Sequence, residues 1–309
     1  MANITAKEVA QLRAQTGCGV MDCKKALVEA EGDFEKATDI LRKKGLAKAA
    51  SKQGRIAAEG IVDIYSENGV AAMIEVNTET DFVARNETFK AFVKDVLKTI
   101  VKNKPADVEA LLACECEGVG TTVEAELNNK IALIQEKITI RRFAIVEGIF
   151  STYVHGGGTS GVIVKFDADD AAVNNAGFAE VAKNISLQAA AMNCLYVFRD
   201  EVPEDVLNHE KEILMAQINN DPKNASKPDQ IKEKMIVGRI NKYYETNCLS
   251  EQSYVKDDNL SVQQYIDAAA KEFGGSIKLV SFVRYEKGEG LEKRDDNFVD
   301  EIANMIGKK

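Results

Sequence analysis

The chain of 309 residues contains no tryptophan, only four prolines and only two histidines. Proline interrupts helix interiors, so its scarcity favours long helices. No uncharged apolar run approaches the roughly 18 residues of a membrane-spanning helix, and residues 1–8 lack the apolar core of a signal peptide. We therefore expect no membrane segment and a cytoplasmic protein.

Positive charge is also scarce, because 40 lysines and arginines face 49 acidic residues and the net charge is −9. Proteins that bind phosphate backbones usually have a basic surface, so we expect no direct contact with nucleic acid. The six cysteines lack a CxxC pair, which favours reduced thiols. With so few histidines the chain has few ligands for a metal site, and we expect neither a metal nor a cofactor.

The composition that is present, 45% hydrophobic and 29% charged, is typical of a folded protein. At its N-terminus, Thr5-Ala6-Lys7-Glu8 has the spacing of a capping box and predicts the start of a helix. Glycines separate this helix from a second one over 21–29, and Asp33 caps a third helix that we expect to end before Gly45. Residues 43–55 contain five basic side chains and no acid, which we interpret as a solvated linker rather than a phosphate-binding stripe.

An internal repeat occupies the middle of the chain. Glu59-Gly60-Ile61 recurs as Glu147-Gly148-Ile149, and Phe89 recurs as Phe178 at nearly the same offset. In each copy, alternating apolar residues predict two strands joined by a turn, and an apolar stripe with helical spacing follows. The fold class that we predict is α+β, with a duplicated core in which a helix covers one face of each sheet.

Two amphipathic segments after the second copy predict an antiparallel helical hairpin. They run from Glu204 to Asn220 and from Asp229 to Tyr244, and their apolar stripes are thin, so we expect the hairpin to project. A closing helix is expected over 297–306. The predicted domains are the three-helix N-terminal domain with its basic linker (1–55), the core N-subdomain (56–140), the first part of the core C-subdomain (141–202), the hairpin insertion (203–246), the completion of the core C-subdomain (247–290) and a C-terminal helical module (291–309).

A glycine run, His155-Gly156-Gly157-Gly158, is similar to the oxyanion-hole loop of some hydrolases. That chemistry also requires a serine on a G-x-S-x-G elbow, and Gly158-Thr159-Ser160-Gly161 has the wrong spacing. No phosphate-binding G-x-x-x-x-G-K-[ST] motif is present. We therefore interpret the glycines as a hairpin turn, expect a protein that is not an enzyme, and keep a hydrolase only as an alternative.

The segment Thr80-Asp81-Phe82-Val83, where a predicted strand meets a helix, has two interpretations. In the first, Asp81 caps the helix and Phe82 belongs to the core. In the second, the carboxylate and the ring dock into a partner, because aromatic side chains often dominate the binding energy of an interface. Composition alone favours the first interpretation.

Several short motifs decide between these interpretations. They are Leu12-Arg13, Thr16-Gly17, the run 21–27, the run 80–86, His155-Gly156 and Gly288-Glu289-Gly290. In these motifs, and over essentially the whole chain, the sequence resembles the bacterial elongation factor Ts family, the guanine nucleotide exchange factors of elongation factor Tu. The family architecture is similar to the one predicted above: a three-helix domain of the ubiquitin-associated type, a duplicated core, an inserted helical hairpin and a C-terminal module.

The resemblance implies a translation factor that binds GDP-bound elongation factor Tu and promotes GDP release, so that GTP can rebind. It implies that Asp81 and Phe82 enter the G domain of the partner near its magnesium and phosphate region. Within this motif, Thr80, Asp81, Phe82 and Val83 are implied in dislocating the magnesium ion. Contacts with the partner are implied for Arg13, Met21, Asp81, Phe82, His155 and Gly156. The resemblance also implies a nucleotide-free complex and is compatible with a 2:2 assembly.

Three places depart from the family pattern. Thr159-Ser160 precede Gly161-Val162, where the family usually has a basic residue and then an isoleucine. Gln135 stands where glycine is frequent in the family, and Ser253 stands where proline is common. One alternative from another functional class stays open, an adaptor that binds partners through residues 1–55.

Overall fold

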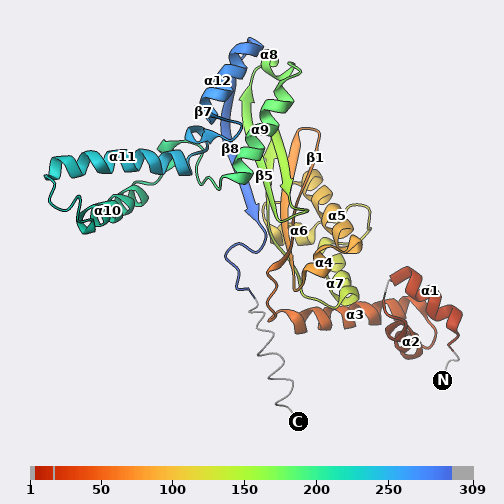
Figure 1. Cartoon of the computed structure of the whole chain (residues 1–309). Coiled ribbons are helices and arrows are strands. Elements are labelled where there is room, and N and C mark those ends of the chain that lie inside the picture. Colours follow the sequence, from red (N-terminus) through yellow and green to blue (C-terminus); the bar gives the residue numbers. More distant parts are fainter. Residues whose placement is uncertain (1–3, 17, 294–309) are drawn as a thin grey trace.

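The computed structural model describes residues 4–16 and 18–293 of the chain (Figure 1). Two three-stranded antiparallel sheets form the centre of the molecule, and helices flank them. The predicted α+β class is therefore confirmed. The closing helix predicted over 297–306 lies outside the described residues. No helix in the described part of the chain is long and apolar enough to span a membrane.

Three helices form the N-terminal unit, α1 (Ala6–Thr16), α2 (Val20–Glu29) and α3 (Phe34–Lys52). The predicted capping box is present, because the Thr5 amide donates to the Glu8 carboxylate at 2.7 Å and the Glu8 amide donates to Thr5 Oγ1 at 3.3 Å. Apolar side chains from all three helices pack into a small core of their own.

Helix α3 does not end at Gly45, as the sequence predicted, but continues to Lys52. A glycine costs a helix interior only about 1 kcal/mol, and Gly45 is buried where α3 packs on α7 (Val123–Ile134), with its Cβ position 3.5 Å from Cβ of Ala132. The buried Lys52 ammonium donates to the backbone carbonyl of Gln135. The interpretation of residues 43–55 as a solvated linker was therefore wrong, since only residues 53–58 connect the helix to the first sheet.

The first sheet has the strand order β1-β2-β3, and its central strand is buried along its whole length. One face is covered by α5, whose apolar stripe packs into the main core as predicted. The first sheet and its helices comprise β1 (Glu59–Glu67), β2 (Val70–Thr78), α4 (Asp81–Ala84), α5 (Glu87–Asn103), α6 (Val108–Ala113), β3 (Ile138–Glu147) and α7.

The second sheet repeats this arrangement with the order β4-β5-β8. Both sheets are antiparallel and each has a register shift at a corresponding place, between Glu75 and Val76 in one and between Lys165 and Phe166 in the other. The strand–turn–strand–helix order predicted for each copy is confirmed. The elements are β4 (Ile149–His155), β5 (Ser160–Ala168), α8 (Asp170–Val173), α9 (Phe178–Ala191), α12 (Val262–Phe273) and β8 (Ile277–Glu286).

A helical hairpin interrupts the second unit and projects away from the sheets (Figure 1). Its first helix, α10 (Glu204–Asn220), has the predicted bounds, and its second, α11 (Asp229–Asn247), ends three residues later than predicted. Short elements connect the hairpin to the second sheet: η1 (Arg199–Glu201), η2 (Leu249–Glu251), β6 (Ser253–Tyr254) and β7 (Asp257–Ser261).

The two sheets pack against each other through buried side chains that include Val62, Met73 and Ile163. The glycine run forms the turn between β4 and β5, as predicted, and this turn lies on β1. The Val62 amide donates to the Gly158 carbonyl at 2.8 Å, and Gly158 has a φ of 106°. A side chain at Gly158 would meet Cβ of Ile61 at 2.9 Å, so this close approach requires glycine.

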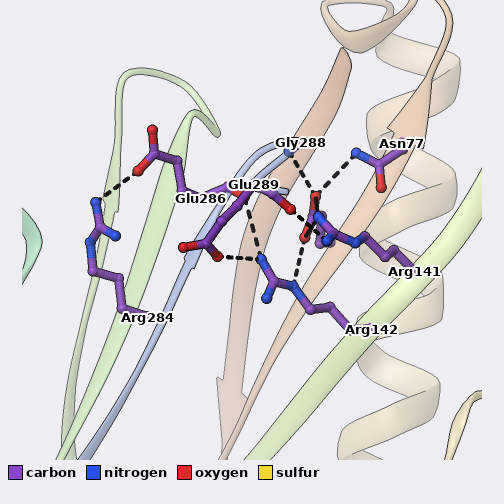
Figure 2. A network of polar contacts seen from close by, with 8 residues as sticks. Asn77, Arg141, Arg142, Arg284, Glu286, Gly288 and Glu289 are labelled. Atoms are coloured by element: carbon purple, nitrogen blue, oxygen red, sulfur yellow. Dashed lines mark hydrogen bonds and ion pairs between the residues drawn. The ribbon is translucent and has the colours of Figure 1, made fainter. Parts of the chain in front are cut away.

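A buried carboxylate, Glu75 on β2, links the end of the second sheet to the first. Figure 2 labels its partners Asn77, Arg141, Arg142 and Gly288. It accepts from Arg141 at 2.9 Å and from Arg142 at 2.7 Å. It also accepts from the Gly288 amide at 2.8 Å and from the Asn77 side chain at 3.1 Å. Burial by itself raises the pKa of Glu75, but these hydrogen bonds outweigh it, so the pKa lies below its ordinary value.

Residues 286–290, which we call the strap, leave β8 and cross to the first sheet. The Glu289 carbonyl accepts from Arg141 at 2.6 Å, and its carboxylate pairs with Arg142 at 3.0 Å. The Arg142 guanidinium also stacks over the Tyr285 ring, with 4.1 Å between Cζ and the ring centroid. Two arginines thus hold both the buried carboxylate and the strap.

We predict that Glu75→Gln lowers the free energy of unfolding by about 1–3 kcal/mol at pH 7, because two partly exposed arginines lose their anion. The pKa of Glu75 is lowered in the folded chain, so its contribution is complete above the ordinary value of 4.5 and is lost as the pH falls through the folded-state pKa. Urea denaturation from pH 7 to pH 3 measures both effects. An unchanged pH dependence in the variant would contradict this assignment.

We also predict that Gln135→Gly raises the free energy of unfolding by about 0.5–1 kcal/mol. Gln135 ends α7 in the left-handed region, with a φ of 67°, where glycine is unstrained. Gln135→Ala is the matched control, because it removes the exposed side chain but keeps the Cβ that causes the strain. Equal stability of the two variants in chemical denaturation would count against this explanation.

Candidate functional site

Phe82 is the most exposed of the large apolar side chains in the described residues, with 81% of its surface accessible. It lies on α4, a single turn between the end of β2 and the start of α5. Thr80, not Asp81, is the N-cap of this turn, since its hydroxyl accepts from the Val83 amide at 3.4 Å. The interpretation of Asp81 as a cap and Phe82 as a core residue was therefore wrong.

The packing of α4 explains why the ring points outward. Ala84 is buried and Val83 packs against the core of the first sheet, so the opposite side of this turn faces solvent. Asp81 is partly exposed beside the ring and pairs with Arg85 at 2.9 Å. The turn thus presents an aromatic ring and a carboxylate side by side at the surface.

A residue distant in sequence holds the start of this turn. Glu136 accepts from the Thr80 amide at 3.0 Å and from the Thr80 hydroxyl at 2.7 Å. The Thr78 hydroxyl donates to the Thr80 carbonyl at 2.9 Å, so both backbone groups of Thr80 are bonded. The neighbouring Glu79 accepts from the Lys137 amide at 2.6 Å. The connector between α7 and β3 therefore fixes the backbone that leads into Phe82.

The second predicted contact, His155, is exposed at the end of β4, and Gly156 begins the turn that follows. His155 Nδ1 lies 3.0 Å from the Tyr153 hydroxyl. Ser160 lies opposite His155 in the neighbouring strand β5, and Glu286 lies opposite Ser160 in β8, so the serine is between the other two. A hydrolytic triad needs the histidine in the middle, between nucleophile and carboxylate, so this row does not support the hydrolase alternative.

The third predicted contact lies in the N-terminal unit. Arg13 is exposed on α1, and Met21 is exposed on α2 beside Val20. A hollow between the two helices is lined by Ile4, Ala6, Val9, Ala10, Arg13, Val20 and Lys24. An apolar hollow lined by two cations is suited to contact with another protein.

The structure brings two of these three places to one end of the sheets. The turn after His155 packs on Ile61, near the start of β1, and Thr78, which leads into α4, pairs with the first residue of that strand. Helices α1 and α2, which carry Arg13 and Met21, lie apart from them at the far end of α3 (Figure 1). Only a partner with a large surface can touch all three.

Reactive groups give no competing centre in the described part of the chain. It contains no cluster of three or more histidine, cysteine or acidic side chains that could hold a metal. All six cysteines are free, and burial raises the pKa of Cys194 to about 12 and those of Cys116 and Cys248 to about 11. These three thiols are therefore poor nucleophiles at neutral pH.

We predict that Glu136→Ala lowers the free energy of unfolding by about 1–2 kcal/mol, because the Thr80 amide and hydroxyl lose their acceptor. Amide hydrogen exchange at Thr80 should accelerate in this variant. Glu124→Ala, which changes an exposed acid of the adjacent helix α7, is the control and should leave that exchange rate unchanged. Equal protection of the Thr80 amide in both variants would contradict the role assigned to Glu136.

The comparisons with known proteins give one consistent result. The family model for elongation factor TS matches residues 79–289, which is more than half of the chain. An elongation factor Ts from Clostridioides difficile (strain 630) is 47% identical over 310 residues, covering 99% of this chain and 100% of that protein. One from Syntrophotalea carbinolica is 45% identical over 308 residues, covering 98% and 99%. This chain therefore belongs to the elongation factor Ts family of translation elongation factors.

Proposed function

We propose that this factor binds GDP-bound elongation factor Tu and releases GDP by inserting Asp81 and Phe82 near the magnesium and phosphate region of the G domain. The observation that carries the proposal is the exposure of Phe82, at 81%, on a turn whose backbone is fixed. Exposing a phenyl ring to water is unfavourable, so burying it in a partner returns about 1.5–3 kcal/mol. GTP then rebinds to the nucleotide-free complex.

The energetics follow from linkage. If binding of the factor weakens GDP affinity by some ratio, GDP must weaken binding of the factor by the same ratio. A coupling of about 3 kcal/mol corresponds to roughly 150-fold. Thr80 and Val83 contribute by holding the turn that carries Asp81 and Phe82, and dislocating the magnesium removes charge that neutralises the GDP phosphates. The factor itself makes and breaks no covalent bond in this scheme.

Further contacts extend the proposed interface. Arg13 and Met21 are assigned to the G domain, and His155 with Gly156 forms a second attachment to the partner. Exposure of Met21 at 61% and of His155 supports these assignments. The proposal includes a 2:2 assembly, and light scattering of the purified complex measures its mass. The alternative of an adaptor acting through residues 1–55 is disfavoured because α3 packs on α7 of the core.

The domain division belongs to the same proposal. We assign residues 1–55 to an N-terminal domain of the ubiquitin-associated type, whose helices pack on a core of their own. The separate cores on the two sheets support two core subdomains, which we place at 56–140 and, in two parts, beyond it, although β3 continues the first sheet across this boundary to Glu147. The parts are 141–202 and 247–290, with the hairpin insertion over 203–246 between them. Residues 291–309, most of which lie outside the described part of the chain, are assigned to a C-terminal module.

The direct test is the release of a fluorescent GDP analogue from elongation factor Tu with and without this protein. We expect catalytic amounts of the factor to accelerate release in the presence of excess unlabelled nucleotide. An unchanged release rate, with both proteins folded, would contradict the proposal.

We predict that Phe82→Ala lowers the rate of stimulated release about tenfold or more, which corresponds to losing the burial energy of one ring. The melting temperature should stay within the error of the parent, because the ring contributes little to the core. Val119→Ala, which trims an exposed apolar side chain between α6 and α7, is the control and should release GDP like the parent. If Phe82→Ala also released GDP at the parent rate, the inserted group would be another one.

A further inference from the structure

We propose that the strap, residues 286–290, is a positioning element that fixes the spacing between the Phe82 turn and the His155 turn, so that both engage the partner together. This inference rests on the proposed function. The strap belongs to neither contact point, yet its hydrogen bonds reach towards both of them.

The first connection is to the His155 turn. The Lys287 amide donates to the Thr159 carbonyl at 2.9 Å. Thr159 closes the turn in its own right, because its amide donates to the His155 carbonyl at 3.0 Å and its hydroxyl donates to the Gly156 carbonyl at 3.1 Å. The strap is therefore bonded to the residue that shapes the second attachment point.

The second connection is to the strand that ends at the Phe82 turn. The next residue of the strap, Gly288, donates its amide to Glu75 at 2.8 Å, and Glu75 lies on β2 shortly before Thr78. The Lys287 ammonium also pairs with Glu59, the cross-strand neighbour of Thr78. Two consecutive residues of the strap thus hold the two turns through different partners.

The strap is stiff for an electrostatic reason. Its anchor, Glu75, has no exposed surface, and withdrawing a buried carboxylate from its arginines is strongly unfavourable. Arg141 and Arg142 also bind Glu289, so moving the strap would break their contacts on both sides (Figure 2). Rigid spacing matters because a second contact on the same body gains effective concentration only when its geometry fits the partner.

Two glycines of this segment provide a matched pair of variants. Gly288 and Gly290 have φ values of 68° and 70°, so alanine introduces the same backbone strain at each. A Cβ at Gly288 would overlap the Ala58 carbonyl oxygen, whereas a Cβ at Gly290 meets nothing within 4 Å. Gly288→Ala therefore displaces the strap and Gly290→Ala does not. Lys287→Met, which removes only the ion pair with Glu59, is a second and milder variant.

The readout is a double-mutant cycle on GDP release, with Phe82→Ala and His155→Ala made singly and together in each background. In the parent and in Gly290→Ala, we expect the loss caused by Phe82→Ala to differ roughly threefold or more according to whether His155 is present. In Gly288→Ala, Phe82→Ala should slow GDP release by the same factor whether or not His155 is present, so the coupling is lost. In Lys287→Met the coupling should lie between that of the parent and that of Gly288→Ala. A purely structural strap would lower stability but leave the coupling unchanged.

The outcomes separate this inference from the function on which it rests. If the parent protein does not accelerate GDP release, the proposed function fails. If the parent accelerates release but shows no coupling, or if the coupling is the same in Gly288→Ala, Lys287→Met and Gly290→Ala, the positioning role of the strap is overturned.

Discussion

A single carboxylate with no exposed surface, Glu75, joins parts of the chain that are 213 residues apart. A buried charge is tolerated only when it is paired and hydrogen-bonded. Arg141 and Arg142 reach Glu75 from the neighbouring strand β3, whereas the Gly288 amide reaches it only when the end of the second sheet lies against the first. The apolar contact between the sheets is non-directional, whereas this network specifies one relative position.

The exposed Phe82 ring is held in place by this rigid structure. A phenyl group on a mobile loop could fold back onto the protein, but the Phe82 turn is held by Val83 and Ala84 on its inner side and by Glu136 at its start. The ring therefore stays in water at a defined place. A preorganised aromatic group loses little entropy when it binds, so more of its burial energy is available to strain the partner.

Local signals in the sequence predicted local features well. The capping box at Thr5, the bounds of α10 and the repeated strand–turn–strand–helix order depend on neighbouring residues or short periods, and all were confirmed. Helix α3 ran past Gly45 because contact with α7 outweighed a weak local preference. The bonds from Glu136 and Glu75 could not be predicted, since their partners lie far away in the sequence. Composition alone favoured a core position for Phe82, whereas the family resemblance implied a contact with a partner, and the fold leaves the ring exposed.

The central claim is that the Phe82 ring leaves water when the factor binds its partner. A fluorinated phenylalanine placed only at position 82 reports this directly, because its fluorine resonance differs between H2O and D2O while the ring is solvated. We predict that this solvent isotope shift is large for the free factor and disappears in the complex with elongation factor Tu. A complex that forms while the ring keeps its full isotope shift would contradict the account.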